Sequence, residues 1–297
     1  MITAAVSAAP KLPAVFRRLA RAAHYRVDRR TSREIQSAEV AAGLKKRISR
    51  TYVRTFLLER GVSDSRANIV GFDVRFRAFW SLSFQFEEIF LGHQYLFTAT
   101  ERAPFIVDCG SNIGMSVLYF KMLYPDAQIL AFEPDPSAFA CLQENMQRNA
   151  FSDVRLENKA LGDFDGQVDF FYDQADPGSL RMSTLKERMP RESRLVEGVR
   201  LSRYVDRDID FLKLDIEGAE TAVVEELGKA KKLRRIRQMI VEYHHHVVRQ
   251  EDDLSRIFAV LEEAGFGYQV EGRVDRPLPR ERSQDIRIYA YRKSIAA

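Results

Sequence analysis

The segment Phe105-Ile-Val-Asp-Cys-Gly-Ser-Asn-Ile-Gly-Met-Ser116 decides the fold class of this 297-residue chain. A short apolar run ends at Asp108, and Gly110 and Gly114 follow just before a run with helical spacing. Glycine lets the backbone turn sharply and approach another group closely. The helix N-terminus beyond presents free N–H groups and a partial positive charge. In an open α/β sheet, nucleotide-like ligands bind at such a junction, outside the carboxyl end of the first strand.

The spacing within this segment argues against a dinucleotide. A dinucleotide fingerprint reads G-x-G-x-x-G, whereas position 112 is Asn and an acid precedes the first glycine. An acid and an amide at these places suit the amino and carboxylate groups of a bound amino acid better than a diphosphate. The candidates for ligand binding are therefore Asp108, Gly110, Ser111, Asn112 and Gly114.

Strand-like and helical runs alternate after this segment. The expected strands are 105–109, 128–133, 154–159, 211–215 and 238–242, and the expected helices are 113–123, 136–149, 219–227 and 252–264. This alternation predicts an α/β fold with a parallel sheet that helices cover on both faces. Two last strands, 267–270 and 285–292, leave no room for a helix between them, so we expect them to pair antiparallel at one edge.

Three other segments do not belong to this alternation of strands and helices. Residues 68–80 alternate partly and predict a pair of strands, and residues 84–97 predict a helix with Phe86, Ile89 and Phe90 inside and 87–88 outside. Residues 172–199 are polar and contain two prolines. Long loops of this kind inside compact domains are usually lids or substrate loops, so we expect this one to shape a binding pocket.

Polar residues follow the second and third strands. Glu133 ends the second strand 23 positions after Gly110, which is where an acid that binds ribose hydroxyls is expected. Its alternative is a surface acid at a strand end. Asn158, at the end of the third strand, is a candidate for the edge of the adenine base, or equally an ordinary turn residue.

The fourth and fifth strands end in titratable side chains. Lys213 interrupts an apolar strand, and the acids Asp215, Glu217 and Glu220 follow it. Such acidic clusters often hold a cation or tune a pKa, although Glu220 also suits the first turn of a helix.

The fifth strand leads through Glu242 into His244 and two further histidines. A histidine there suits a general base. At most two consecutive histidines could share one metal ion, and a structural role for each stays open.

The composition is that of a globular chain, since 45% of the residues are hydrophobic and 30% are charged. These values exclude collagen-like, low-complexity and largely disordered chains. No run approaches the roughly 20 apolar residues of a membrane span, and we expect no signal peptide at residues 1–13. Cys109 and Cys141 make no disulfide framework, so a cytoplasmic location is expected.

The net charge of +4 is distributed unevenly. Residues 1–60 carry 14 Lys and Arg against 4 Asp and Glu, a net charge of +10, and the remainder carries −6. Residues 13–60 have helical apolar stripes formed by Phe16, Leu19, Ala20 and Ala23 and by Ile48, Tyr52, Phe56 and Leu57. Such a helix binds an anionic membrane surface or an acidic partner, or it is a solvated extension. We divide the chain into a basic helical extension, 1–60, and a main domain, 61–297, with lead-in elements at 61–100 and a core at 101–297.

Together these segments resemble the FkbM family of S-adenosylmethionine-dependent methyltransferases. The matching stretches are Val107–Gly114, Ala131–Pro134, Ala160–Gly162 and Leu212–Glu220, and Phe86–Phe90 resembles the lead-in helix of the family. The Lys-x-Asp-x-Glu-Gly-x-Glu block is the most specific part. Cys109 and Ser111 depart from the apolar and small residues usual at those places, but both are small enough to fit. Residues 1–60 lie outside the resemblance.

The resemblance implies a class I methyltransferase fold, a Rossmann-like α/β sheet of seven mostly parallel strands with an antiparallel last strand. It implies that S-adenosyl-L-methionine donates a methyl group to a hydroxyl of a sugar, glycan or polyketide-type small molecule. Asp108 and Asn112 would hold the amino-acid end of the donor and Glu133 its ribose, with Asp215 also near the donor.

A base must take the proton of the acceptor hydroxyl, and the order of preference is His244, Asp215, Glu242. A divalent metal held by Asp215 and Glu242 is the less favoured alternative. We expect a small-molecule or glycan substrate and no nucleic acid, because the main domain is acidic. Peripheral membrane contact through residues 1–60 and homo-oligomerisation stay open. The rival functions are an NAD-dependent oxidoreductase and a non-enzymatic binding module on a methyltransferase-like core.

Overall fold

The computed structural model describes residues 38–58, 64–176, 178–189, 191–247, 253–272 and 284–293. The chain forms two compact units, Met1–Gly61 with Asn68–Gly71, and Val62–Ala67 with Phe72–Ala297. We describe each unit by itself.

The first unit contains helix α3 (Ala38–Thr51) and the π-helical segment η1 (Tyr52–Leu58). Ile48 and Tyr52, two members of the second predicted stripe, are buried. The first predicted stripe, at residues 16–23, lies outside the described residues. Membrane contact through residues 1–60 and the domain boundary therefore stay predictions.

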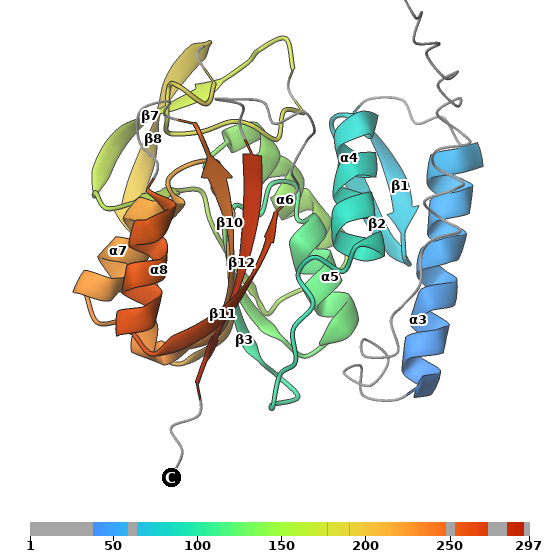
Figure 1. Ribbon diagram of the computed structural model, residues 1–297. Helices are drawn as coiled ribbons and strands as arrows, with labels where there is room; N and C mark the ends of the chain where they lie inside the picture. The colour runs from blue at the N-terminus through green and yellow to red at the C-terminus, as the bar shows by residue number, and fades with distance from the viewer. Residues whose placement is uncertain are drawn as a thin grey trace, which may run out of the picture. The chain divides into compact units, whose positions relative to one another are not determined.

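The second unit is built on a seven-stranded sheet with the order β11-β12-β10-β9-β3-β4-β5 (Figure 1). The strands are β3 (Phe105–Cys109), β4 (Gln128–Phe132), β5 (Val154–Glu157), β9 (Ile209–Leu214), β10 (Ile236–His245), β11 (Phe266–Gly272) and β12 (Gln284–Arg292). The strands from β10 to β5 are parallel, whereas β12 is antiparallel to both β10 and β11. The mostly parallel sheet with an antiparallel last strand is thus confirmed.

Helices cover both faces of this sheet, as predicted. Helices α7 (Glu220–Lys229) and α8 (Leu254–Glu263) lie on one face, and α4 (Phe79–Gln85), α5 (Met115–Leu123) and α6 (Pro136–Arg148) lie on the other (Figure 1). The shorter helical segments are η2 (Phe86–Leu91), η3 (Leu201–Tyr204) and η4 (Leu233–Arg235). Proline in the first turn of α6 and a capping aspartate before it fix the start of that helix.

The central strands are apolar on both faces, as is typical of parallel sheets. Buried side chains from neighbouring strands, among them Val107, Leu130, Leu212 and Val241, form the core. Two charged side chains, Asp108 on β3 and Lys213 on β9, are buried in the same strands. Burying a charge is costly unless it is paired. The pair therefore indicates that the sheet has a role at this place besides packing.

The lead-in elements agree with the sequence in kind but not in their bounds. Strands β1 (Ser65–Ile69) and β2 (Phe72–Phe76) form the predicted pair. The next helical stretch begins earlier than expected, at Phe79, and ends at Leu91 rather than at position 97. Its predicted inner residues, at 86, 89 and 90, are buried.

The prediction of a loop over residues 172–199 is wrong in its second half. Strand β8 (Glu192–Arg200) pairs there with β6 (Ala160–Gly162) and β7 (Gly166–Tyr172) in a separate three-stranded sheet. Most of β8 is exposed, and only Val196, Gly198 and Val199 are buried. A strand with so few buried positions has no clear apolar alternation.

Among the described residues, no helix has the length and apolar character needed to cross a membrane.

Candidate active site

A cavity of about 1190 Å³ lies at the carboxyl ends of β3, β4, β9 and β10. This is where open α/β sheets bind their ligands. The predicted site residues that line it are Gly110, Ser111, Asn112, Glu133, Asp215, Glu242 and His244. Three other predicted residues, Asp108, Gly114 and Asn158, do not line it.

The loop after β3 is shaped by residues with positive φ angles. The φ angles are 88° at Gly110, 48° at Asn112 and 95° at Gly114. A Cβ on Gly110 would lie 1.9 Å from the carbonyl oxygen of Asp215, and a Cβ on Gly114 would lie 2.8 Å from Leu142 Cδ1. Gly114 therefore serves the packing of α5 against α6. Gly114 does not line the cavity, whereas Gly110 does and lies against the Asp215 carbonyl after β9.

Asp108 lies beneath the cavity and is completely buried. Its Oδ2 accepts a hydrogen bond from Ser116 Oγ, and its Oδ1 lies 3.4 Å from Lys213 Nζ. Lys213 Nζ also donates to the Gly110 carbonyl at 2.8 Å. Burial disfavours the charge of Lys213, but Asp215 and Asp108 outweigh it and raise the pKa of the ammonium group. The sequence predicted that Asp108 faces the ligand, but in the structure it does not line the cavity. It instead holds Lys213 and the glycine loop from behind.

Glu133 faces the cavity from the end of β4 and is only 5% exposed. Its Oε2 accepts the N–H of Asn112 and its Oε1 the N–H of Asp135, each at 2.8 Å. Burial raises the pKa of Glu133 to about 8, although these N–H bonds act in the opposite direction. Asn158 donates to the carbonyls of Glu133 and Pro134. It thus holds the turn after β4, in keeping with the turn role that the sequence left open, and its contact with the adenine base stays a prediction.

Asp215 follows β9, and its side chain is 22% exposed. Its Oδ2 accepts a hydrogen bond from the Tyr95 hydroxyl at 3.2 Å and lies 3.4 Å from Lys213 Nζ. Burial opposes ionisation of Asp215, but the charges of Lys213 and His244 outweigh it and hold its pKa below the ordinary value. The cavity wall thus carries an ionised carboxylate at this point.

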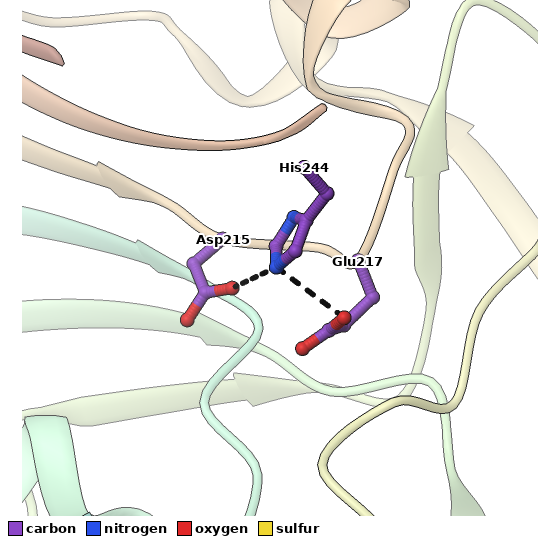
Figure 2. A group of neighbouring side chains, drawn as sticks. All are labelled: Asp215, Glu217 and His244. Carbon is purple, nitrogen blue, oxygen red and sulfur yellow. Dashed lines mark ion pairs between the residues drawn. The ribbon is translucent and has the colours of Figure 1, made fainter. Parts of the chain in front are cut away.

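His244 comes from the end of β10 and points at Asp215 and Glu217 (Figure 2). Its Nε2 lies 3.3 Å from Glu217 Oε2 and 4.0 Å from Asp215 Oδ1, and its Nδ1 lies 3.0 Å from Glu220 Oε1. Burial lowers the pKa of His244, but Glu217 and Glu220 outweigh it and raise this pKa to about 10. In this state the imidazole carries a proton at neutral pH and cannot accept another. The surrounding carboxylates therefore favour the charged form of His244 over the neutral form of a base, and the identity of the base stays a prediction.

Glu217 and Arg188 are site residues that the sequence analysis did not select. Arg188 Nε donates to Glu217 Oε2 at 2.7 Å, and both side chains line the cavity. Burial raises the pKa of Glu217 to about 7, opposed by His244 and Arg188. The acidic run after β9 did signal Glu217, whereas Arg188 lies in a polar segment that carries no such signal.

Glu242 on β10 has partners outside this group. It accepts a hydrogen bond from Gln94 Nε2, and its Oε1 lies 3.7 Å from Arg287 Nε. Burial raises the pKa of Glu242 to about 8, and the charge of Asp215 adds to the rise. The pairing of Asp215 and Glu242 on one metal ion stays a prediction. Among the described residues, ligand atoms of Asp215, Glu217 and His244 lie within 4.8 Å of one another.

Comparison with known proteins identifies the family to which this chain belongs. The profile of the Methyltransferase FkbM domain matches residues 108–268. Methyltransferase sdnD of Sordaria araneosa is 32% identical over 219 residues, which are 62% of this chain and 81% of that protein. The 2-O-methyltransferase NoeI of Sinorhizobium fredii is 30% identical over 169 residues, 51% of this chain and 68% of its own length.

Two further proteins that are similar to this chain are named FkbM. The 31-O-demethyl-FK506 methyltransferase FkbM of Streptomyces tacrolimicus is 27% identical over 216 residues, 62% of this chain and 81% of that protein. The crystal structure of Methyltransferase FkbM from Methylobacillus flagellatus matches with a TM-score of 0.44 and 18% identity, over 66% of this chain and 45% of that one. Because the family profile spans more than half of the sequence, this chain belongs to the FkbM family and is a methyltransferase.

Proposed function

We propose that this protein transfers a methyl group from S-adenosyl-L-methionine to a hydroxyl of a sugar, glycan or polyketide-type small molecule. Family membership implies this donor, which supplies an electrophilic methyl group on a sulfonium when it is bound. The relatives named as a 2-O-methyltransferase and a 31-O-demethyl-FK506 methyltransferase support O-methylation. The observation that carries the proposal is one cavity with the Glu133 carboxylate just after β4 and an acidic group after β9.

The donor side of the cavity fits the ribose and amino-acid parts of this donor. Each oxygen of Glu133 accepts one backbone N–H, and each keeps a lone pair for a ribose hydroxyl. The loop from Gly110 to Asn112 lines the cavity beside Glu133. Asp108 and Asn158 support these elements from behind, through Lys213 and the turn after β4.

The acceptor side has room for a second molecule. Pockets for drug-sized ligands hold about 300–1,000 Å³, and this cavity measures about 1190 Å³. Trp80 and Phe84 line it while remaining 50% and 53% exposed. Exposed aromatic faces next to carboxylates suit an acceptor with an apolar ring face and free hydroxyls. Because methyl transfer is an in-line displacement, such positioning supplies much of the acceleration.

Geometry makes Asp215 the first choice to receive the hydroxyl proton. It faces the cavity, whereas both nitrogens of His244 lie beside carboxylates. Glu242 is likewise engaged, by Gln94. The acceptor hydroxyl would donate a hydrogen bond to Asp215, and that carboxylate would hold the proton that the hydroxyl gives up.

The test is donor binding followed by product analysis. Calorimetry should show one site for S-adenosyl-L-methionine and no binding of NADH. Above pH 8, where the Glu133 carboxylate is mostly ionised, Glu133→Gln should weaken donor binding by about 1.5–3 kcal/mol, the contribution of hydrogen bonds to a charged group. Glu157→Gln, at the end of the neighbouring strand β5 and outside the cavity, is the matched control. Unchanged donor affinity in Glu133→Gln would overturn the ribose assignment, and tight NADH binding would overturn the proposed function.

Methyl transfer itself needs a screen of acceptors. Purified protein with methyl-labelled S-adenosyl-L-methionine would be incubated with pools of glycans and hydroxylated small molecules, and labelled products identified by mass spectrometry. Label on a hydroxyl oxygen supports the proposal. Label found on nitrogen or carbon alone would contradict O-methylation.

A further inference from the structure

Asp215, Glu217 and His244 converge on one point at the wall of the cavity (Figure 2). Their ligand atoms lie within 4.8 Å of one another. An ion bonded to ligands at about 2.0–2.4 Å spans pairs of ligand atoms about 3–4.8 Å apart. The spacing therefore matches that of three ligands on one ion, with no movement of the backbone.

The orientation of His244 is fixed from behind by a carboxylate. Glu220 Oε1 accepts the N–H groups of Ile216 and Gly218, each at 3.0 Å, so it acts as an acceptor. His244 Nδ1, 3.0 Å away, must then be the donor to it. A ligating histidine is commonly held in this way, with its second nitrogen turned to the metal. Here Nε2 is turned to two carboxylate oxygens.

The surroundings contain more negative than positive charge. Lys213 lies between Asp108 and Asp215, and Arg188 pairs with Glu217. Glu220 adds a further carboxylate that is completely buried, and its Oε2 has no hydrogen-bond partner. Counting a protonated His244, three cations face four carboxylates, and His244 is 5% exposed beside them. A divalent ion in place of that proton would balance the four negative charges.

A proton on His244 satisfies only part of this arrangement. A proton on Nε2 can be donated to Glu217 Oε2, which lies 3.3 Å from that nitrogen. Asp215 Oδ1 lies 4.0 Å from Nε2, which is beyond hydrogen-bond distance. A metal ion, by contrast, bonds all three atoms at once. Arg188, which donates to Glu217, then plays the part of the hydrogen-bonding group that orients a ligating carboxylate.

We propose that Asp215, Glu217 and His244 bind one divalent cation, with open positions toward the cavity that the acceptor hydroxyl occupies. One imidazole nitrogen and two carboxylate oxygens suit Mn²⁺ and related first-row ions. The role of the ion rests on the proposed O-methyltransferase function, in which Asp215 takes the proton of the acceptor hydroxyl. The bound cation would lower the pKa of that hydroxyl, and the Asp215 oxygen that does not bind the ion would still receive the proton. Metal binding itself does not depend on that function.

The experiment is a titration of the full-length protein with Mn²⁺ after dialysis against EDTA and then metal-free buffer. Loss of the electron paramagnetic resonance signal of free Mn²⁺ reports binding. We expect one site in the wild type, no measurable binding in Asp215→Asn and His244→Gln, and about 10–100-fold weaker binding in Glu220→Gln, which removes only the group behind the histidine. Glu271→Gln, also on the cavity wall, is the matched control and should bind like the wild type.

Each outcome decides one of the two proposals. Wild-type protein that binds S-adenosyl-L-methionine but not Mn²⁺ overturns the metal site and leaves the methyltransferase proposal standing. Mn²⁺ binding that Asp215→Asn and His244→Gln leave unchanged places the ion elsewhere and also overturns the site. Protein that binds Mn²⁺ with the expected variant pattern but no methyl donor supports the site and refutes the proposed function. Circular dichroism and thermal unfolding check that each variant is folded.

Discussion

Replacement of Lys213 by Met should destabilise the protein far more than the loss of an ordinary surface charge. The side chain is 2% exposed, and its ammonium group lies 3.4 Å from both Asp108 and Asp215. It also donates to the carbonyls of Gly110 and Cys109. Removing one partner of a buried ion pair costs about 3–5 kcal/mol, because an uncompensated charge stays behind. We therefore expect the free energy of unfolding to fall by about that amount.

Lys121→Met is a matched control for this experiment. Lys121 is equally buried and donates to the carbonyls of Ala127 and Pro125, but its partner Asp153 is 37% exposed. Water can solvate Asp153 when the lysine is lost, so we expect a smaller loss of about 1–3 kcal/mol.

Urea titrations followed by circular dichroism would measure both variants and the double variant Lys213→Met with Asp108→Asn. The double variant should regain part of the lost stability, since it also removes the stranded charge. If Lys213→Met is no more destabilising than Lys121→Met, or if Asp108→Asn only adds to the loss, the ion pair is not what stabilises this part of the sheet.

Three further predictions follow from single residues. Gly110→Ala should destabilise the fold by about 1–3 kcal/mol more than Gly166→Ala in thermal unfolding, because both have positive φ but only the first would place a Cβ against the Asp215 carbonyl; equal losses would contradict this. Glu133 has a pKa of about 8 and is mostly protonated at pH 7, so donor binding that needs its carboxylate should release a proton and strengthen as pH rises toward 8. Calorimetry in two buffers should detect that proton in the wild type and not in Glu133→Gln; absence from both would refute the linkage. Trp80→Ala should raise the KM for the acceptor while it changes stability by less than about 0.5 kcal/mol, and an unchanged KM would remove Trp80 from the acceptor site.

The sequence predicted those features that local patterns encode. The strand before Gly110 and the antiparallel final strand follow from apolar runs and connection lengths, and the structure has both. Sequence patterns could not predict contacts between segments that lie far apart along the chain. Tyr95 contacts Asp215 across 120 positions, and Gln94 contacts Glu242 across 148. No periodicity in the sequence predicts such pairs.

The roles of Asp108 and Lys213 show why even a correct motif can be misassigned. Strands β3 and β9 are parallel neighbours, and their register sets Asp108 opposite Lys213. Side chains alternate along a strand, so the lysine and the acid two positions later share one face. One ammonium group can therefore balance Asp108 and Asp215 while it holds the Gly110 carbonyl. An acid before a glycine is consistent with a ligand contact in sequence, and only the pairing of β3 with β9 shows that its first partner is the protein itself.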